Sequence, residues 1–193
     1  MKTFFVIFLL VHSMDAFSQH LFSSQHSISS GNAEMNSFEV NCEDDCYFTM
    51  FLEVSKLDFE SPAESGAMFR VWDETRKKYV LFGIKANKQT MTPQLTIITS
   101  SGEPEKVLGS SELGAFEGFQ FKWKDGKFRL NILRRVKMDG YSQIKQSPLF
   151  FEGKLAFHPR AVEYLFLGAD VTQYIDASSQ NINPEWTRMV NGS

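Results

Sequence analysis

The chain has 193 residues with 20 basic and 23 acidic side chains, so its formal net charge is −3. This near balance excludes attraction of the whole chain to a polyanion and argues against nucleic acid as a partner. The length suits one domain with its own core and does not suit two.

The N-terminus has the layout of a secretory signal peptide. Lys2 precedes an apolar run at residues 4–11, and small residues follow at Ala16 and Ser18. The run is too short to anchor the chain in a bilayer, and no other stretch is long and apolar enough to span one. We expect cleavage after Ser18, so that residues 1–18 are the signal peptide of a secreted, extracellular protein.

Residues 19–37 are polar and rich in serine, without a helical or strand period. This composition is typical of either a flexible lead-in or an extended edge segment. We expect order to begin near Phe38.

Cys42 and Cys46 are the two cysteines of the chain, and an oxidising compartment favours their pairing. Fully extended, their Cα atoms would lie roughly 13 Å apart, beyond the limit of about 7 Å for a bridge. A disulfide therefore requires a tight turn at residues 43–45, and aspartates suit such turns. The spacing is not that of a redox C-x-x-C pair, and a zinc site lacks nearby histidines. We predict a structural disulfide, with free thiols as the alternative.

The first half of the mature chain contains five stretches with the alternation typical of strands, at residues 46–54, 67–72, 79–86, 94–99 and 106–108. Turn-forming or charged segments separate them. The stretch at 79–86 is apolar on both sides, which predicts a central strand covered on two faces.

Residues 119–133, FQFKWKDGKFRLNIL, predict a β-hairpin around the two-residue turn Asp125-Gly126. The turn sets the register. The apolar cross-strand pairs are Trp123 with Phe128, Phe121 with Leu130, and Phe119 with Ile132. The opposite face carries four basic side chains: Lys122, Lys124, Lys127 and Arg129. Their pairing places like charges opposite one another, which weakens a sheet.

After the hairpin, residues 134–147 predict either a long loop or a ragged hairpin, and residues 149–157 resume the alternation with Gly153 as a bulge. Residues 164–167 form the last clear strand, and residues 171–193 form a tail without a period. With about 8–10 short strands and little helix, the sequence predicts an all-β protein. The expected architecture is an antiparallel two-sheet sandwich of the jelly-roll type over residues 38–170.

Three stretches resemble laminin G-like and related concanavalin A-like jelly rolls, in the same order along the chain. They are Gly-Ala-Met-Phe leading through Trp-Asp to Tyr-Val-Leu-Phe-Gly at residues 66–83, Phe-Lys-Trp-Lys-Asp-Gly-Lys-Phe at 121–128, and Tyr-Leu-Phe-Leu-Gly at 164–168. The second and third also resemble the farnesoic acid O-methyltransferase-like domain, another sandwich. The resemblance covers about residues 38–170 and implies a sandwich that binds glycans, proteoglycans or other matrix proteins. It carries no calcium site across, because the family's rim ligands have no matching residues here.

The sequence offers no catalytic motif for hydrolysis, phosphate binding or dinucleotide binding, so we expect no enzyme and no cofactor. Outside the signal peptide the histidines are His20, His26 and His158, and we interpret His158 as an ordinary strand-end residue. Several loop acids supply oxygen ligands that suit Ca²⁺, but their spacing follows no calcium-loop motif. They are Glu43, Asp44, Asp45, Asp139 and Asp170. We favour solvated loop acids over a metal site.

The basic face of the hairpin is the candidate ligand site, with two arginines just beyond it in the sequence. Its residues are Lys122, Lys124, Lys127, Arg129, Arg134 and Arg135. Such a patch attracts a sulfated glycan, anionic lipid head groups or an acidic protein surface. The alternative is a solvated face whose charge is balanced by Glu112, Glu117 and Glu152 on neighbouring segments.

The leading hypothesis is a secreted, non-enzymatic binding module that recognises an anionic glycan or an extracellular protein through the basic hairpin. The first alternative is a structural component of an extracellular matrix or venom without a defined small ligand. The second is a carboxylate-dependent enzyme acting on glycans. The ligand, the oligomeric state and the use of the glycosylation sequon at Asn191 stay open.

Overall fold

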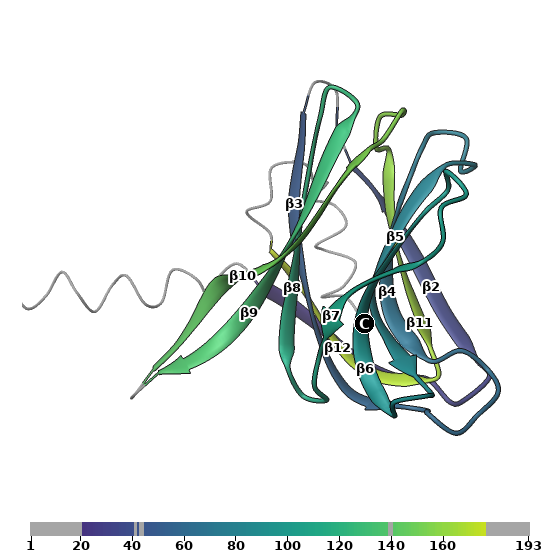
Figure 1. Cartoon of the computed structure of the whole chain (residues 1–193), viewed down its shortest axis with the longest axis vertical. Coiled ribbons are helices and arrows are strands. Elements are labelled where there is room, and N and C mark those ends of the chain that lie inside the picture. Colours follow the sequence, from purple (N-terminus) through teal and green to yellow (C-terminus); the bar gives the residue numbers. More distant parts are fainter. Residues whose placement is uncertain (1–20, 41, 43–44, 139–140, 177–193) are drawn as a thin grey trace, which may run out of the picture.

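A computed structural model describes residues 21–40, 42, 45–138 and 141–176. They form two antiparallel sheets of six strands each, packed face to face as a jelly-roll-like sandwich, with no helix (Figure 1). The strands are β1 Leu21–Ser27, β2 Ala33–Glu39, β3 Asp45–Leu57, β4 Gly66–Trp72, β5 Tyr79–Asn87, β6 Thr92–Thr99, β7 Lys106–Ser110, β8 Phe116–Lys124, β9 Lys127–Met138, β10 Tyr141–Lys154, β11 Ala161–Leu167 and β12 Ala169–Asp176. The prediction of an all-β sandwich is confirmed. Within these residues, no helix has the length and apolar character needed to cross a membrane.

The strand order of the first sheet is β1-β12-β3-β8-β9-β10, and that of the second is β2-β11-β4-β5-β6-β7. We call them sheet A and sheet B. Consecutive hairpins build one half of each sheet, whereas the first and last strands of the described chain, β1 and β12, are neighbours in sheet A. One edge of sheet A is therefore built from the first and the last of the described strands.

The β8–β9 hairpin has the predicted register, with Trp123 opposite Phe128 and Lys122 opposite Arg129. Asp125 and Gly126 both adopt positive φ angles, of 50° and 71°, as a two-residue type I′ turn requires. The turn matches the right-handed twist of the two strands, so the short D-G signal fixes which side chains face the core.

The core between the sheets is built largely of aromatic rings. Phe121 stacks on Phe48, Phe82 and Phe128, with centroid separations of 5.0, 6.1 and 5.6 Å. These rings come from both sheets and are almost fully buried. Burial of one such side chain stabilises the fold by roughly 2–3 kcal/mol, so the apolar face of the hairpin is a principal source of stability.

Strand β5 is apolar on both sides, as the sequence predicts. Its Val80, Phe82 and Ile84 lie in the main core, and Leu81 lies in a second cluster with Met68 and neighbouring apolar side chains on the outer side of sheet B. The strand lies in the interior of the sheet order, between β4 and β6.

The polar segment before Phe38 is structured, so the prediction that order begins near Phe38 is wrong. Residues 21–27 and 33–39 form β1 and β2, each at the edge of a sheet. Edge strands need fewer apolar side chains because one side of each strand meets solvent. Of the two interpretations of this segment, the extended edge segment is therefore the one that the structure shows.

The prediction that the chain loses regular structure beyond Asp170 is also wrong. Strand β12 continues to Asp176 and inserts between β1 and β3. Its polar Gln173 is 1% exposed, which masks the strand period in the sequence. The signal-peptide residues 1–18 and the remainder of the tail, including Trp186, Met189 and Asn191, lie outside the described residues.

Residues 134–147 were predicted to form either a long loop or a ragged hairpin. Their described part, 134–138 and 141–147, belongs to the paired strands β9 and β10, whose register shifts between Gln146 and Phe150. The bulge expected at Gly153 is not there, because Gly153 pairs regularly with Phe128. A Cβ on Gly153 would lie 2.6 Å from Cε1 of Phe128. The glycine is needed for space beside this ring and not for a bulge.

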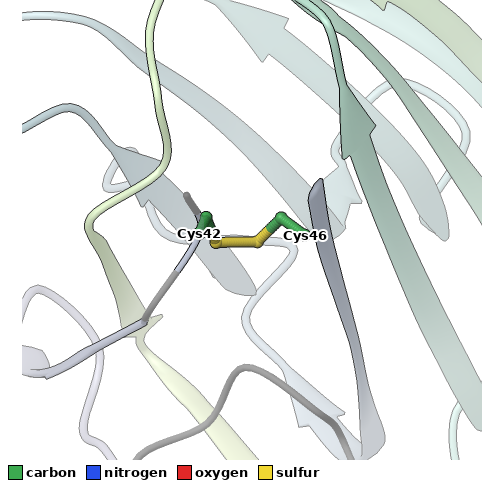
Figure 2. Close-up of a disulfide and its surroundings, with 2 residues drawn as sticks. All are labelled: Cys42 and Cys46. Carbon is green, nitrogen blue, oxygen red and sulfur yellow. A yellow bond between two sulfur atoms is a disulfide. The ribbon is translucent and has the colours of Figure 1, made fainter. Parts of the chain in front are cut away.

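The predicted disulfide between Cys42 and Cys46 is confirmed (Figure 2). The two Cα atoms lie 4.9 Å apart and both side chains are buried. The bridge lies where the chain passes from β2 in sheet B to β3 in sheet A. It therefore fixes the start of β3 beside the end of the β8–β9 hairpin.

Candidate functional site

The outer face of sheet A is built from rows of side chains that run across β3, β8, β9 and β10. The row nearest the hairpin turn contains Asp45, Lys124, Lys127 and Lys154. The next row contains Tyr47, Lys122, Arg129 and Glu152. Intervening residues such as Trp123 and Phe128 point into the core. Strand alternation thus brings the four predicted hairpin cations together on one surface.

These two rows line an open groove of about 870 Å³. Its lining contains five basic side chains, Lys122, Lys124, Lys127, Arg129 and Lys154, and three acidic ones, Asp45, Asp125 and Glu152. We call it the basic groove. Lys154 was not predicted to belong to this surface, because the register of β10 against β9 is not predictable across the shift at Gln146.

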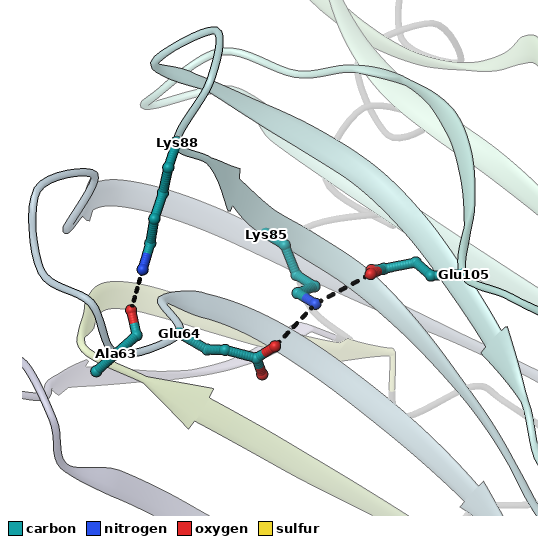
Figure 3. A network of polar contacts seen from close by, with 5 residues as sticks. All are labelled: Ala63, Glu64, Lys85, Lys88 and Glu105. Atoms are coloured by element: carbon teal, nitrogen blue, oxygen red, sulfur yellow. Dashed lines mark hydrogen bonds and ion pairs between the residues drawn. The ribbon is translucent and has the colours of Figure 1, made fainter.

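Most cations of the basic groove are unpaired. Nη1 of Arg129 donates to Glu152 at 2.8 Å, but no carboxylate among the described residues lies within ion-pair distance of its four lysines. On sheet B, by contrast, Lys85 of β5 pairs with Glu64 at 3.4 Å and with Glu105 at 3.2 Å, and Nζ of the nearby Lys88 donates to the carbonyl of Ala63 (Figure 3). The groove is therefore locally positive in a chain that is acidic overall.

Arg134 and Arg135 do not join the basic groove. Arg134 has the strand parity of Phe128 and turns inward, where its Nε donates to the buried Glu117 at 3.0 Å. Arg135 turns outward, and its guanidinium lies 4.0 Å from the ring centroid of Phe116. Both line a separate pocket of about 560 Å³ that also contains Glu112. Glu112, Glu117 and Glu152 were the acids expected to balance the positive charge of the hairpin. Of these three, Glu152 pairs with Arg129, and none pairs with a hairpin lysine.

A chain of hydrogen-bonded polar side chains crosses sheet A beside the basic groove. Nε2 of Gln120 donates to the Tyr47 hydroxyl at 3.0 Å, and Nδ2 of Asn131 donates to Oε1 of Gln120 at 3.0 Å. Oδ1 of Asn131 then accepts from Nε of Arg129 at 2.8 Å and from Nε2 of Gln146 at 3.1 Å. We call these five residues the amide ladder. The predicted hairpin register already places Gln120 opposite Asn131, and this signal was available in the sequence.

A second polar cluster joins the edges of the two sheets. Oγ of Ser24 lies 2.8 Å from Nε2 of His26, whose Nδ1 donates to Oε1 of Glu34 at 2.8 Å. The Tyr164 hydroxyl donates to the same oxygen at 3.4 Å, and burial together with the charge of Glu34 raises the pKa of Tyr164. The order hydroxyl, imidazole, carboxylate is that of a hydrolytic triad. Neither Ser24 nor His26 lines the basic groove or the Arg134 pocket. No sequence motif marks this cluster.

His158 follows β10, and its ring packs 4.8 Å from that of Trp123. Asp170 accepts a hydrogen bond from Ser27 at 2.6 Å. Among the described residues, no three His, Cys, Asp or Glu side chains are grouped so as to hold a metal ion. Glu43, Asp44 and Asp139 of the proposed acid pool lie outside these residues.

No protein-family model matches the sequence, and no curated protein matches it. Among solved structures, the fold is similar to that of a Scytalido-glutamic peptidase with a peptide-based transition state analog, with 11% identity over 69% of this chain and a TM-score of 0.46. This match spans 65% of the peptidase's own length.

A tetrameric galectin from the ball sponge Cinachyrella matches with 12% identity over 78% of this chain and all of its own, with a TM-score of 0.45. A carbohydrate-binding module from Bacillus subtilis matches with 8% identity over 80% of this chain and 91% of its own, with a TM-score of 0.39. Because all three scores lie below 0.5, we base no argument about ligand or activity on these likenesses.

Proposed function

We infer that this protein is a secreted binding protein without catalytic activity, and that it holds an anionic glycan in the basic groove. One observation supports this above all: Lys124 faces Lys127, and Lys127 faces Lys154, on adjacent strands. Asp45 lies opposite Lys124, but no carboxylate among the described residues lies within ion-pair distance of these three lysines. Like charges directly opposite one another destabilise a sheet. Features that lower stability without a structural gain are typical of functional sites.

The local charge is suited to a ligand with a few anionic groups. Five basic and three acidic residues line the groove, so its formal charge is +2. Its ionic contacts are exposed and therefore weaken as salt rises. An acidic protein surface offers the same kind of charge, and we favour a glycan because polar side chains continue the site beyond the cations.

Retention on immobilised heparin tests the proposal. We expect Lys122→Glu/Lys127→Glu to abolish retention at moderate salt, because both side chains are exposed and line the groove. The matched control is Lys77→Glu/Lys78→Glu in the β4–β5 loop, whose side chains are also exposed and which changes the net charge equally. Equal elution of wild type and the groove variant, or equal loss in both variants, would contradict the proposed site.

Secretion is tested separately by expression of the full chain in a eukaryotic cell line and N-terminal sequencing of the medium. We expect a mature protein that begins at Gln19. A protein that stays in the cell with Met1 intact would show that the N-terminal segment is not a signal peptide.

A further inference from the structure

The amide ladder lies directly beside the basic groove on the same face of sheet A. Gln120 and Asn131 occupy the row after Lys122 and Arg129, with Phe150 at its end on β10. Arg129 and Tyr47 belong to both the ladder and the second row of the groove. Successive rows on one face are about 7 Å apart, so the ladder extends the polar surface beyond the cations.

The ladder keeps hydrogen-bonding capacity that its internal bonds do not use. A primary amide has two N–H donors and two acceptor lone pairs. Gln120 uses one donor and one lone pair in the bonds described above, and Gln146 uses one donor. Asn131 is 3% exposed and its oxygen accepts two bonds, so it orients its neighbours. The surface thus presents fixed donors and acceptors side by side.

An aromatic side chain flanks this polar surface. Phe150 is 49% exposed, and the Arg129 guanidinium lies 4.5 Å from its ring centroid. The cation–π contact and the ion pair with Glu152 hold Arg129 in place. A half-exposed ring next to preorganised polar groups is a combination that ligand sites use to fix orientation.

A sugar ring matches this combination. Each hydroxyl both donates and accepts, as the amides do, and the C–H face of a pyranose is apolar and packs on an aromatic ring. An acidic polypeptide also satisfies the lysines, and its backbone groups can bond to neutral amides, but it does not combine hydroxyl groups with an apolar C–H face in one ring. The amides and Phe150 together therefore favour the sugar.

We propose that the amide ladder is a subsite for the hydroxyl groups and the apolar C–H face of a sugar ring adjoining the anionic group held by the basic groove, so that the ligand is an anionic oligosaccharide. This inference rests on the proposed function. Gln120, Gln146 and Phe150 contact the ring, and Asn131 positions the two glutamines.

The test compares two double variants on β10 by isothermal titration with a heparin hexasaccharide at several salt concentrations. Gln146→Ala/Phe150→Ala removes one exposed side chain of the ladder and the exposed ring that flanks it, without touching the core. Tyr141→Ala/Gln143→Ala removes the same kinds of side chain, also exposed, from the same strand outside the ladder. Lys122→Glu/Lys127→Glu serves as the reference for the ionic contacts.

We expect the ladder variant to raise Kd about tenfold, the equivalent of one stacking contact or one to two hydrogen bonds. Because it removes no charge, the slope of log Kd against log salt should stay that of wild type. The Tyr141/Gln143 control should bind as wild type does. The lysine variant should lose affinity and flatten the slope, as expected when fewer counterions are released.

The outcomes separate the two proposals. If the ladder variant binds the hexasaccharide like wild type while the lysine variant does not, the ladder subsite is overturned and the basic groove stands. If a poly-glutamate peptide binds as tightly as the hexasaccharide and is insensitive to the ladder variant, the ligand is an acidic protein. If wild type binds no anionic glycan, the proposed function fails. An array of neutral glycans then tests the ladder alone. If no neutral glycan binds, or if the ladder variant binds them as wild type does, the ladder subsite is overturned.

Discussion

His26 on β1 and Glu34 on β2 lie 2.8 Å apart, although their strands are the edges of opposite sheets. The imidazole is largely buried and packs against the rings of Tyr164 and Phe166, with centroid separations of 5.4 and 5.0 Å. The pair therefore holds the two sheet edges together beside residues 28–32, the short connection that joins β1 to β2. Without the Glu34 carboxylate, the Nδ1–H donor of this imidazole loses its acceptor.

We predict that Glu34→Ala lowers the free energy of unfolding by about 1–2 kcal/mol, because a partly buried donor loses its partner. Glu39→Ala is the matched control, since Glu39 lies on the same strand and is exposed. Urea denaturation measures both. A Glu34 variant as stable as the Glu39 variant would show that the contact between the edges contributes nothing.

The Ser24–His26–Glu34 cluster tests the expectation that the protein is not an enzyme. A serine nucleophile also needs donors for the oxyanion and a groove that holds the substrate, and the basic groove does not include Ser24. We predict no labelling by a fluorophosphonate probe at neutral pH. Labelling that Ser24→Ala removes would show instead that Ser24 is an activated nucleophile.

Gly118 is required by the ring of Phe51 on the neighbouring strand. A Cβ at this position would lie 2.6 Å from two ring carbons of Phe51 and 2.8 Å from Cβ of Leu133. We predict that Gly118→Ala lowers the free energy of unfolding by about 1–3 kcal/mol through overpacking. The cost should shrink in a Phe51→Ala background. Equal costs in both backgrounds, from thermal or urea unfolding, would show that the ring does not oppose the methyl group.

The disulfide closes a loop of five residues, from Cys42 to Cys46. Chain entropy alone gives such a loop a stabilisation of roughly 2 kcal/mol. We predict a loss of this size when the protein is reduced with dithiothreitol, measured by urea unfolding of the oxidised and reduced forms. Heparin retention should survive reduction because the groove cations lie on strands held by other contacts. Global unfolding on reduction would contradict this.

The stabilisation that the Asp73 carboxylate gives to the β4–β5 loop depends on pH. Burial raises the pKa of Asp73, but hydrogen bonds from the backbone of Lys78 and Lys77 and from the Thr75 hydroxyl outweigh it, so the pKa lies below 3.8. The carboxylate therefore stabilises the fold fully above the unfolded value of 3.8, and this stabilisation is lost as pH falls through the folded pKa.

We predict that Asp73→Asn is less stable than wild type at neutral pH and that this difference narrows below pH 3.8. Glu74→Gln, which removes an exposed neighbouring carboxylate, serves as the control and should show no such convergence. Unfolding free energies measured across the acid range decide the matter. A constant difference at every pH would rule out the carboxylate as the cause.

The hairpin was predictable because the Asp125-Gly126 turn fixes the register. The period of two then determines on which face of the sheet each side chain lies. The same alternation places Arg134 on the inner face of the sheet, as it does Phe128. Assigning Arg134 to the basic face because it is close to the hairpin in sequence overlooks this alternation. Lys154 enters the groove only through the β9–β10 register, which a shift near Gln146 hides from the sequence.

Strands β1 and β12 escaped prediction because edge and polar strands carry little apolar period. His26 and Glu34 are only eight residues apart, but no local pattern indicates that the chain changes sheet between them, at residues 28–32. What the sequence could not predict is thus mostly the pairing of distant strands, since that pairing depends on the whole topology.

Strand β12, the last of the described chain, lies between β1 and β3 and pairs with both. During synthesis, β1 therefore has no partner and one edge of β3 stays open until residues 169–176 have emerged from the ribosome. Exposed strand edges recruit other chains, so the nascent protein is open to aggregation at these edges until β12 has paired. A chain that stops short of β12 leaves that gap permanently, which would make premature termination more damaging than many substitutions within the core.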